Sequence, residues 1–200
     1  LTKTCSKYAK RLNAISVRES TGFALCKDYL GVDATCVLDP TILAGADAYK
    51  PLLKEKTEEQ DYLFAYILDV TPEKQAYVES MAKSRGLKAI IQSADKNATL
   101  YVEDWLSMIA NSSLVVTDSF HGSVFSILFH RDFYSIVNIA RGGTRFSSLL
   151  SPLGLEHRMG DVSQLQSLEL PTPVDWKQVD HILDNQRQDS INFLTNALKK

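Results

Sequence analysis

The chain has 200 residues, of which 44% are hydrophobic and 23% are charged, and its formal net charge is −2. This composition is typical of a globular protein that can bury a sizeable core. The near-neutral charge argues against a nucleic-acid binder, which usually carries a basic patch. No apolar run approaches the roughly 20 residues that a transmembrane helix needs, so no membrane span is expected.

The cysteines and the N-terminus indicate the cellular setting. Cys5, Cys26 and Cys36 are odd in number and lack the CxxC spacing of a metal or redox site. We interpret them as reduced and mostly buried, which fits a cytoplasmic protein. The opening residues lack the apolar stretch and cleavage site of a signal peptide. Because the chain starts at Leu1, inside a polar helical pattern, we expect a shortened form or the tail half of a longer protein.

Short β-branched runs alternate with helical patterns along the chain. Strands are predicted at 14–17, 35–38, 62–68, 88–92, 114–117 and 133–137, and helices at 21–30, 72–85, 102–111, 119–129 and 176–198. Strands separated by helices of this length indicate βαβ crossovers. The predicted fold is therefore α/β, a Rossmann-like parallel sheet with helices on both faces. The polar stretch 44–61 is the best candidate for a connection between two lobes.

The stretch LVVTDSFHGSVFSILF, residues 114–129, places polar residues where a buried strand passes into a helix. The carboxyl end of such a strand is where open α/β sheets hold ligands. Asp118 or Ser119 is expected to cap the helix, and Gly122 to let a ligand or a neighbouring backbone approach closely. The first N–H groups of the helix, with the hydroxyls of Ser119 and Ser123, form a candidate anion site.

His121 lies in the first turn of this predicted helix. An imidazole at this place could give or take a proton near neutral pH. The spacing fits equally an ordinary capped helix in which the histidine only packs. Both interpretations stay open on the spacing alone.

Two polar residues follow the predicted strands at 14–17 and 35–38. Arg18, at the end of what is expected to be a buried strand, offers a fork of donors suited to phosphate or carboxylate. A local pairing with Glu19 or a helix-capping arrangement is the alternative. Asp39 precedes Pro40 and either orients a substrate hydroxyl or caps the next turn, and capping is the favoured interpretation.

Two arginines, Arg141 and Arg145, flank a Gly-Gly pair after the strand at 133–137. They could clamp an anion, lie on a solvated loop or, for Arg145, begin a helix over FSSLL. The chain has no metal-ligand spacing, no GxGxxG and no P-loop, so neither a metal site nor a nucleotide fingerprint is predicted.

The segment EDWLSMIANSSLVVTDSFHGSVFSILFHRDFYSI resembles the signature of the polysaccharide pyruvyl transferase family, with TDSFHG as its most specific block. The segments ISVRESTG, VLDPTIL and RFSSLLSPLGLEHR extend the resemblance in family order. The resemblance implies a two-lobed protein similar to GT-B glycosyltransferases. Residues 1–50 would then be the tail of the first Rossmann-like lobe, and residues 51–200 the second Rossmann-like lobe with a C-terminal helix.

The resemblance also implies an activity for what would be a bacterial enzyme. A pyruvyl group is transferred from phosphoenolpyruvate to two hydroxyls of one sugar of a surface polysaccharide, which forms a cyclic ketal and releases phosphate. Phosphoenolpyruvate is the donor substrate, the acceptor is a sugar or a lipid-linked glycan, and no cofactor or metal is required. His121 matches the general acid. The residues expected to bind substrate are Arg18, Ser119, Gly122, Ser123, Arg145 and Asp39.

Two other functions stay open at this point. A GT-B-like glycosyltransferase could use the same helix end for the diphosphate of a nucleotide sugar, with a carboxylate such as Glu156 holding the ribose. A non-catalytic lobe could bind only an anionic ligand or a partner.

Overall fold

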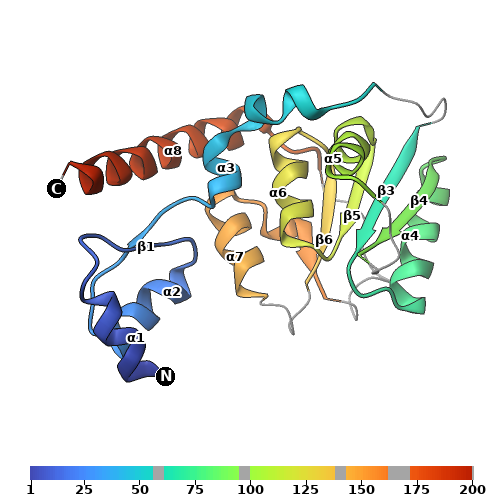
Figure 1. Ribbon diagram of the computed structural model, residues 1–200. Helices are drawn as coiled ribbons and strands as arrows, with labels where there is room; N and C mark the ends of the chain where they lie inside the picture. Colours follow the sequence, from blue (N-terminus) through green and yellow to red (C-terminus); the bar gives the residue numbers. More distant parts are fainter. Residues whose placement is uncertain (56–60, 95–99, 138–142, 162–171, 200) are drawn as a thin grey trace. The chain divides into compact units, whose positions relative to one another are not determined.

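A computed structural model describes residues 1–55, 61–94, 100–137, 143–161 and 172–199. The contacts within it divide the chain into two units (Figure 1). The smaller unit consists of Leu1–Leu43 and Asp175–Lys200, and the larger of Ala44–Val174. The assignment of these units to the two lobes of a longer protein stays a prediction.

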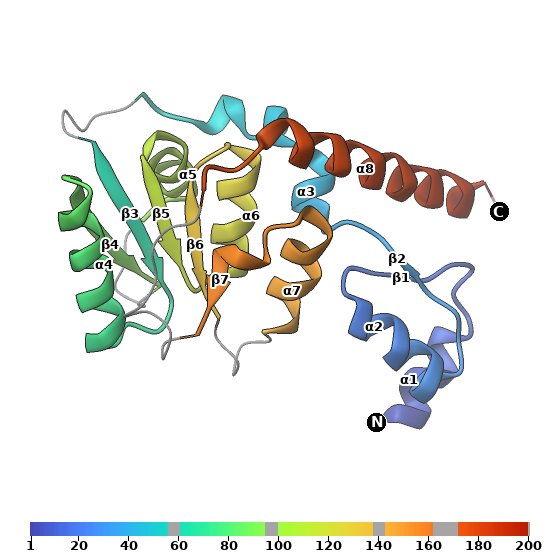
Figure 2. The same cartoon turned by 180° about the vertical axis from the view of Figure 1, so that it is seen from behind.

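The larger unit is built on a parallel sheet of five strands in the order β4-β3-β5-β6-β7. The strands are β3 (Tyr62–Ile67), β4 (Lys88–Ser93), β5 (Leu114–Thr117), β6 (Phe133–Ile136) and β7 (Met159–Gly160). Helices α4 (Pro72–Ser84), α5 (Val102–Asn111) and α6 (Phe120–Leu128) join successive strands, and α7 (Thr144–Leu150) precedes β7 (Figures 1 and 2). The predicted Rossmann-like α/β class is confirmed.

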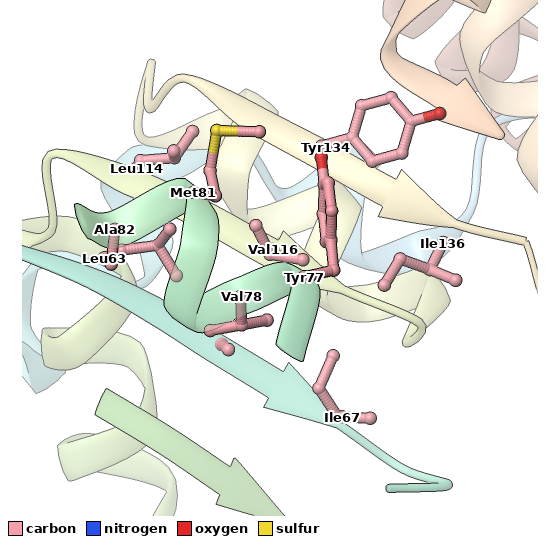
Figure 3. Packing of buried hydrophobic residues seen from close by; sticks show 11 residues of the cluster. Leu63, Ile67, Tyr77, Val78, Met81, Ala82, Leu114, Val116, Tyr134 and Ile136 are labelled. Atoms are coloured by element: carbon pink, nitrogen blue, oxygen red, sulfur yellow. The ribbon is translucent and has the colours of Figure 1, made fainter. Parts of the chain in front are cut away.

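Alternate side chains of the strands face opposite layers of helices. On one face, α4 packs its apolar side chains against β3, β5 and β6 (Figure 3). This cluster contains Leu63, Ala65, Ile67, Tyr77, Val78, Met81, Ala82, Leu114, Val116, Tyr134 and Ile136. On the other face, α6 packs on β5 and β6, where Ser123 Oγ lies 2.7 Å from Ser135 Oγ. The sheet is therefore covered on both faces, as the unbroken apolar runs predict.

The smaller unit contains a two-stranded parallel sheet of β1 (Ser16–Val17) and β2 (Thr35–Cys36). Its helices are α1 (Thr2–Ala9), α2 (Ser20–Leu25) with a π-helical turn at Cys26–Leu30, α3 (Pro40–Ala44) and α8 (Trp176–Leu198). The strands are shorter than predicted, and neither contains a buried residue. The prediction of a buried strand ending at Arg18 is therefore wrong for the described structure, because the described residues add no further strand to this sheet.

The long helix α8 belongs by its contacts to the smaller unit. Ser190 Oγ accepts a hydrogen bond from Leu38 N at 3.0 Å, and Arg187 donates to the carbonyl oxygen of Ile42 at 3.4 Å. These bonds join α8 to the segment that follows β2. The expected grouping of this helix with residues 51–200 in a second lobe stays a prediction.

All three cysteines are free, and only Cys26 is buried. The expectation of mostly buried thiols is wrong for Cys5, because α1 has no buried residue, and for Cys36, which lies on the exposed strand β2. Among the described residues, no helix combines the length and apolarity needed to cross a membrane.

A buried ion pair joins the carboxyl ends of β3 and β5. The carboxylate of Asp118 accepts hydrogen bonds from Leu68 N at 2.6 Å, Asp69 N at 3.2 Å and Lys74 Nζ at 2.7 Å. The Lys74 ammonium also donates to the carbonyl oxygen of Asp69 at 2.9 Å. The side chains of Lys74 and Asp118 are 6% and 0% exposed. Asp118 therefore holds two strand ends and the first turn of α4 together.

We predict that Lys74→Met lowers the free energy of unfolding by about 3–5 kcal/mol, because it leaves the Asp118 carboxylate buried without its cation. Lys54→Met is the matched control, since Lys54 pairs with Asp104 while 55% of its side chain is exposed. It should cost far less. Urea unfolding followed by circular dichroism measures both. Equal losses in the two variants would contradict a structural role for the buried pair.

Candidate active site

A pocket of about 500 Å³ lies at the carboxyl ends of β3 and β4 and against α5 and α6. This volume is within the range of small-molecule sites, about 300–1,000 Å³. The described residues that line it are Tyr66, Ser93, Ala94, Leu100, Val102, Trp105, Ser119, His121 and Phe125. The pocket therefore lies where open parallel sheets bind ligands, and it includes two of the residues that the sequence singled out, Ser119 and His121.

The junction of β5 and α6 is held by a chain of hydrogen bonds. Thr117 Oγ1 donates to the carbonyl oxygen of Tyr66 at 2.6 Å and accepts from Ser119 N at 3.0 Å. Ser119 is the N-cap of α6, because its Oγ accepts from Gly122 N at 3.4 Å. Two amides of the predicted anion site, those of Ser119 and Gly122, therefore already have partners within the protein. The Ser119 hydroxyl keeps its own hydrogen to donate.

His121 is half-buried in the first turn of α6 and faces the pocket as part of its lining. Its ring lies edge-to-face with that of Phe120, with centroids 5.3 Å apart. Phe120 in turn meets Phe146 of α7 at 6.1 Å. The beginnings of α6 and α7 are thus adjacent.

Gly122 and Ser123 are absent from the described pocket lining. A Cβ added at Gly122 would lie 2.4 Å from Thr117 Oγ1 and 2.9 Å from its Cγ2. The glycine is therefore needed where the helix crosses the strand end, and the close approach is to the protein's own side chain. Ser123 is fully buried and is bonded to Ser135, as well as to the carbonyl oxygen of Ser119 at 3.4 Å. Both residues hold α6 on the sheet, and we leave them out of the proposed substrate contacts.

Arg18 and Asp39 form an ion pair within the smaller unit. Arg18 donates to Asp39 Oδ2 at 2.5 Å, and Asp39 Oδ1 accepts from Thr41 N at 2.9 Å, as the capping interpretation predicts. Burial alone would raise the pKa of the Asp39 carboxyl, but the hydrogen bonds from Thr41 and Arg18 outweigh it and hold that pKa below its ordinary value. A substrate-binding role stays a prediction for both residues.

Arg145 lies in the first turn of α7 and is half-buried. It is therefore a helix-start residue rather than part of a solvated loop. Its neighbour in the predicted clamp, Arg141, lies outside the described residues. The substrate-binding role of Arg145 also stays a prediction.

The pocket has an aromatic wall that was not predicted from the sequence. Trp105 of α5 meets Tyr66 of β3 at 5.3 Å and Phe125 of α6 at 5.2 Å, with interplanar angles of 62° and 87°. Burial, and then the charge of Asp118, raises the pKa of the Tyr66 phenol, so it stays neutral and can donate a hydrogen bond at neutral pH. The sequence contains little indication of these residues, because each belongs to a different element and is typical by itself of a hydrophobic core position.

A sequence model of the family described as polysaccharide pyruvyl transferase matches residues 1–139 of the 200-residue chain. The chain belongs to this family. Neither a search of curated proteins nor a search of solved structures gave a match. The span shared with the pyruvyl transferase family includes His121 and the whole β5–α6 junction, whereas Arg145 lies beyond it. No group of three or more His, Cys, Asp or Glu residues in the described ranges is arranged to hold a metal ion.

We predict that Gly122→Ala destabilises the protein by about 1–3 kcal/mol, because the new methyl group overlaps Thr117. The direction of the change in the free energy of unfolding is informative, since replacing a glycine inside a helix by alanine usually stabilises a protein by about 0.5–1 kcal/mol. Urea unfolding gives the value. The same change in a Thr117→Ala background should cost less, because Oγ1 and Cγ2 are gone. A stabilised single variant would contradict the close packing of α6 on β5.

We predict that Asp39→Asn reduces the sensitivity of the chain to acid. The pKa of Asp39 is depressed, so its carboxylate stabilises the fold fully above its ordinary pKa of about 3.9 and loses this effect as pH falls through the lower, folded value. Urea midpoints at neutral pH and near pH 3 should therefore differ less in the variant than in the parent. Asp184→Asn, at a side chain 71% exposed, is the control and should leave that difference unchanged.

Proposed function

We propose that the chain transfers the pyruvyl group of phosphoenolpyruvate to two hydroxyls of one sugar in a surface polysaccharide or its lipid-linked precursor. The observation that carries the proposal is the family match over residues 1–139 together with His121 in the lining of a pocket at the sheet's carboxyl edge. The family supports a polysaccharide pyruvyl transferase, and the pocket supplies a residue suited to the proton transfer that such a reaction needs.

The proposed reaction balances without an oxidant or reductant. A proton is added to the methylene carbon of phosphoenolpyruvate, which leaves a cation at the adjacent carbon that one sugar hydroxyl attacks. Phosphate then leaves from that carbon, and a second hydroxyl of the same sugar takes its place. The two hydroxyls lose their protons, one to replace the proton spent on carbon and one to the departing phosphate. The products are a cyclic ketal and inorganic phosphate.

In this proposal His121 is the acid that protonates the methylene carbon, and it can afterwards accept a proton from an attacking hydroxyl. Its place in the first turn of α6 is fixed by the Ser119 cap and by the packing of Gly122 on Thr117. A catalytic group held in this way reacts faster, because its orientation is set before the substrate arrives. Phe120, which lies against the imidazole, further restricts its movement.

The phosphate and carboxylate of phosphoenolpyruvate need cations, because a buried anion without one is strongly disfavoured. Within the larger unit, Arg145 is the proposed partner, because α7 begins next to the first turn of α6. An arginine can meet a phosphate or carboxylate with two parallel hydrogen bonds. Arg18 is the proposed second cation, on the strength of the resemblance alone.

We predict that His121→Ala lowers phosphate release from phosphoenolpyruvate by roughly 10²–10⁴-fold, the usual contribution of a general acid. The assay uses the whole chain with a panel of methyl pyranosides as acceptors. Phosphoenolpyruvate should still bind to the variant, as measured by calorimetry. His157→Ala is the matched control, since His157 is exposed in the turn Glu156–Arg158 and should leave turnover unchanged.

Turnover at the parental rate in His121→Ala would remove His121 from the mechanism. Release of phosphate that does not depend on any acceptor would contradict pyruvyl transfer. Sugar transfer from a nucleotide sugar, without consumption of phosphoenolpyruvate, would identify a glycosyltransferase instead. Binding of phosphoenolpyruvate with no turnover on any acceptor would favour a non-catalytic lobe.

A further inference from the structure

We infer that the pocket lined by Trp105 is the subsite of the acceptor and holds its pyranose ring, while the anionic groups of the donor bind outside it. This assignment rests on the proposed function and adds to it which substrate occupies the described pocket. It follows from the charge of the lining, from its aromatic wall and from its hydroxyl groups.

The described lining carries no permanent charge. Its nine residues are aromatic, aliphatic or hydroxyl-bearing, apart from the imidazole of His121. An anion with a phosphate and a carboxylate would lose its hydration there without gaining an arginine or lysine from these residues. An uncharged sugar loses less on entering, because its C–H groups are apolar and its hydroxyls need only hydrogen-bond partners.

The aromatic wall suits the C–H face of a pyranose. Trp105 meets both Tyr66 and Phe125 edge-to-face and forms a parallel stack with neither of them. The π face of an aromatic ring carries negative charge, and it attracts the slightly positive hydrogens of an apolar ligand face. Trp105 has the largest ring and contacts both of the others, and we therefore take it as the main wall. Its Nε1 is buried and has no hydrogen-bond partner in the described structure.

Hydroxyl partners for a sugar stand around the same space. The Tyr66 phenol, kept neutral by burial, can donate or accept, and Ser93 of β4 has the same capacity. Ser119 keeps a hydrogen to donate after capping α6. Together they offer a few placed polar groups on a mostly apolar wall, which is the usual composition of a small-molecule site.

The position of His121 links this subsite to the chemistry. The histidine belongs to the lining at the start of α6, next to Ser119, whereas Trp105 and Val102 come from α5. A sugar that packs against Trp105 would therefore lie in the same pocket as His121, the general acid of the proposed reaction. The donor's reactive carbon would then meet the acceptor at the His121 side of the pocket.

The chain has only two tryptophans, which allows a direct test. In the Trp176→Phe chain, Trp105 is the single tryptophan and reports on the pocket through its fluorescence. We expect at least one methyl pyranoside to change its emission saturably, and saturating phosphoenolpyruvate to leave that change in place. Emission that responds instead to phosphoenolpyruvate or to uridine diphosphate, in competition with every sugar, would overturn the assignment.

A kinetic test on the otherwise unaltered chain separates the two substrates. Trp105→Ala should raise the KM for the acceptor by roughly tenfold or more and leave the KM for phosphoenolpyruvate within about twofold, as loss of one binding surface predicts. Trp105→Phe keeps an aromatic ring, and its KM for the acceptor should lie between those of Trp105→Ala and the parent. This intermediate value separates a loss of binding from a failure to fold. Tyr101→Ala is the control, because Tyr101 is 71% exposed next to α5 and does not line the pocket.

The possible results show separately whether the acceptor subsite or the proposed pyruvyl transfer is wrong. Sugar-dependent phosphate release with an unchanged acceptor KM in Trp105→Ala would refute the subsite and leave pyruvyl transfer standing. A sugar that alters Trp105 emission in a chain that never consumes phosphoenolpyruvate would refute pyruvyl transfer and leave a sugar-binding pocket. No response of Trp105 to any sugar in the panel, alongside turnover that saturates with one of them, would also refute the subsite.

Discussion

The ends of β3 and β5 are held at a fixed separation by one buried carboxylate, that of Asp118, which is bonded to two backbone amides and to Lys74. From this point the chain turns into α6, and the turn is kept tight by Thr117 and Gly122. Because a buried charge is tolerated only with its full set of partners, the arrangement has little freedom to relax. His121 follows this junction in the first turn of α6 and belongs to the lining of the pocket.

The two substrates of the proposed reaction differ in charge, and so do the residues proposed to bind them. One substrate is a small dianion or trianion, and the other is an uncharged ring with hydroxyls. The described pocket lining is aromatic and, apart from His121, has no ionisable side chain other than the Tyr66 phenol, whereas Arg145 lies on α7, which contacts the start of α6 through Phe146. In the proposed arrangement the acceptor lies among the described aromatic side chains and the anionic groups of the donor lie outside them, so both substrates can bind at once. Such a division also limits unproductive binding of phosphate in the place of the sugar.

The elements of the larger unit could be predicted well because their signals are local. Thr71 and Pro72 begin α4 and Gly86 follows its end, all within one helix length. The apolar runs of β3 and β5 likewise predict strands that are buried on both faces. The exposure of β1 could not be predicted in this way, because the burial of a strand depends on which other strands pair and pack beside it.

The candidate site was only partly predictable, for a similar reason. Helix α6 is buried almost all round, so periodicity cannot tell that Ser123 faces Ser135 while His121 faces the pocket. The pair of Arg18 and Asp39 joins residues 21 positions apart and requires the register of β1 on β2. The aromatic wall comes from three elements that meet only through the strand order. The motif and the resemblance predicted His121 as a candidate site residue, and the tertiary structure shows which residues line the pocket with it.

Mass spectrometry of a saccharide product formed from phosphoenolpyruvate in deuterated water tests directly whether the pyruvyl group is transferred through a protonated enol carbon. If the enol carbon is protonated from the solvent-exchanged acid before the sugar attacks, the sugar should gain a carboxyethylidene group whose methyl carries one deuteron, with one phosphate released for each ketal formed. A saccharide of unchanged mass despite release of phosphate would contradict transfer of the pyruvyl group to the sugar. So would a ketal methyl that contains no deuterium.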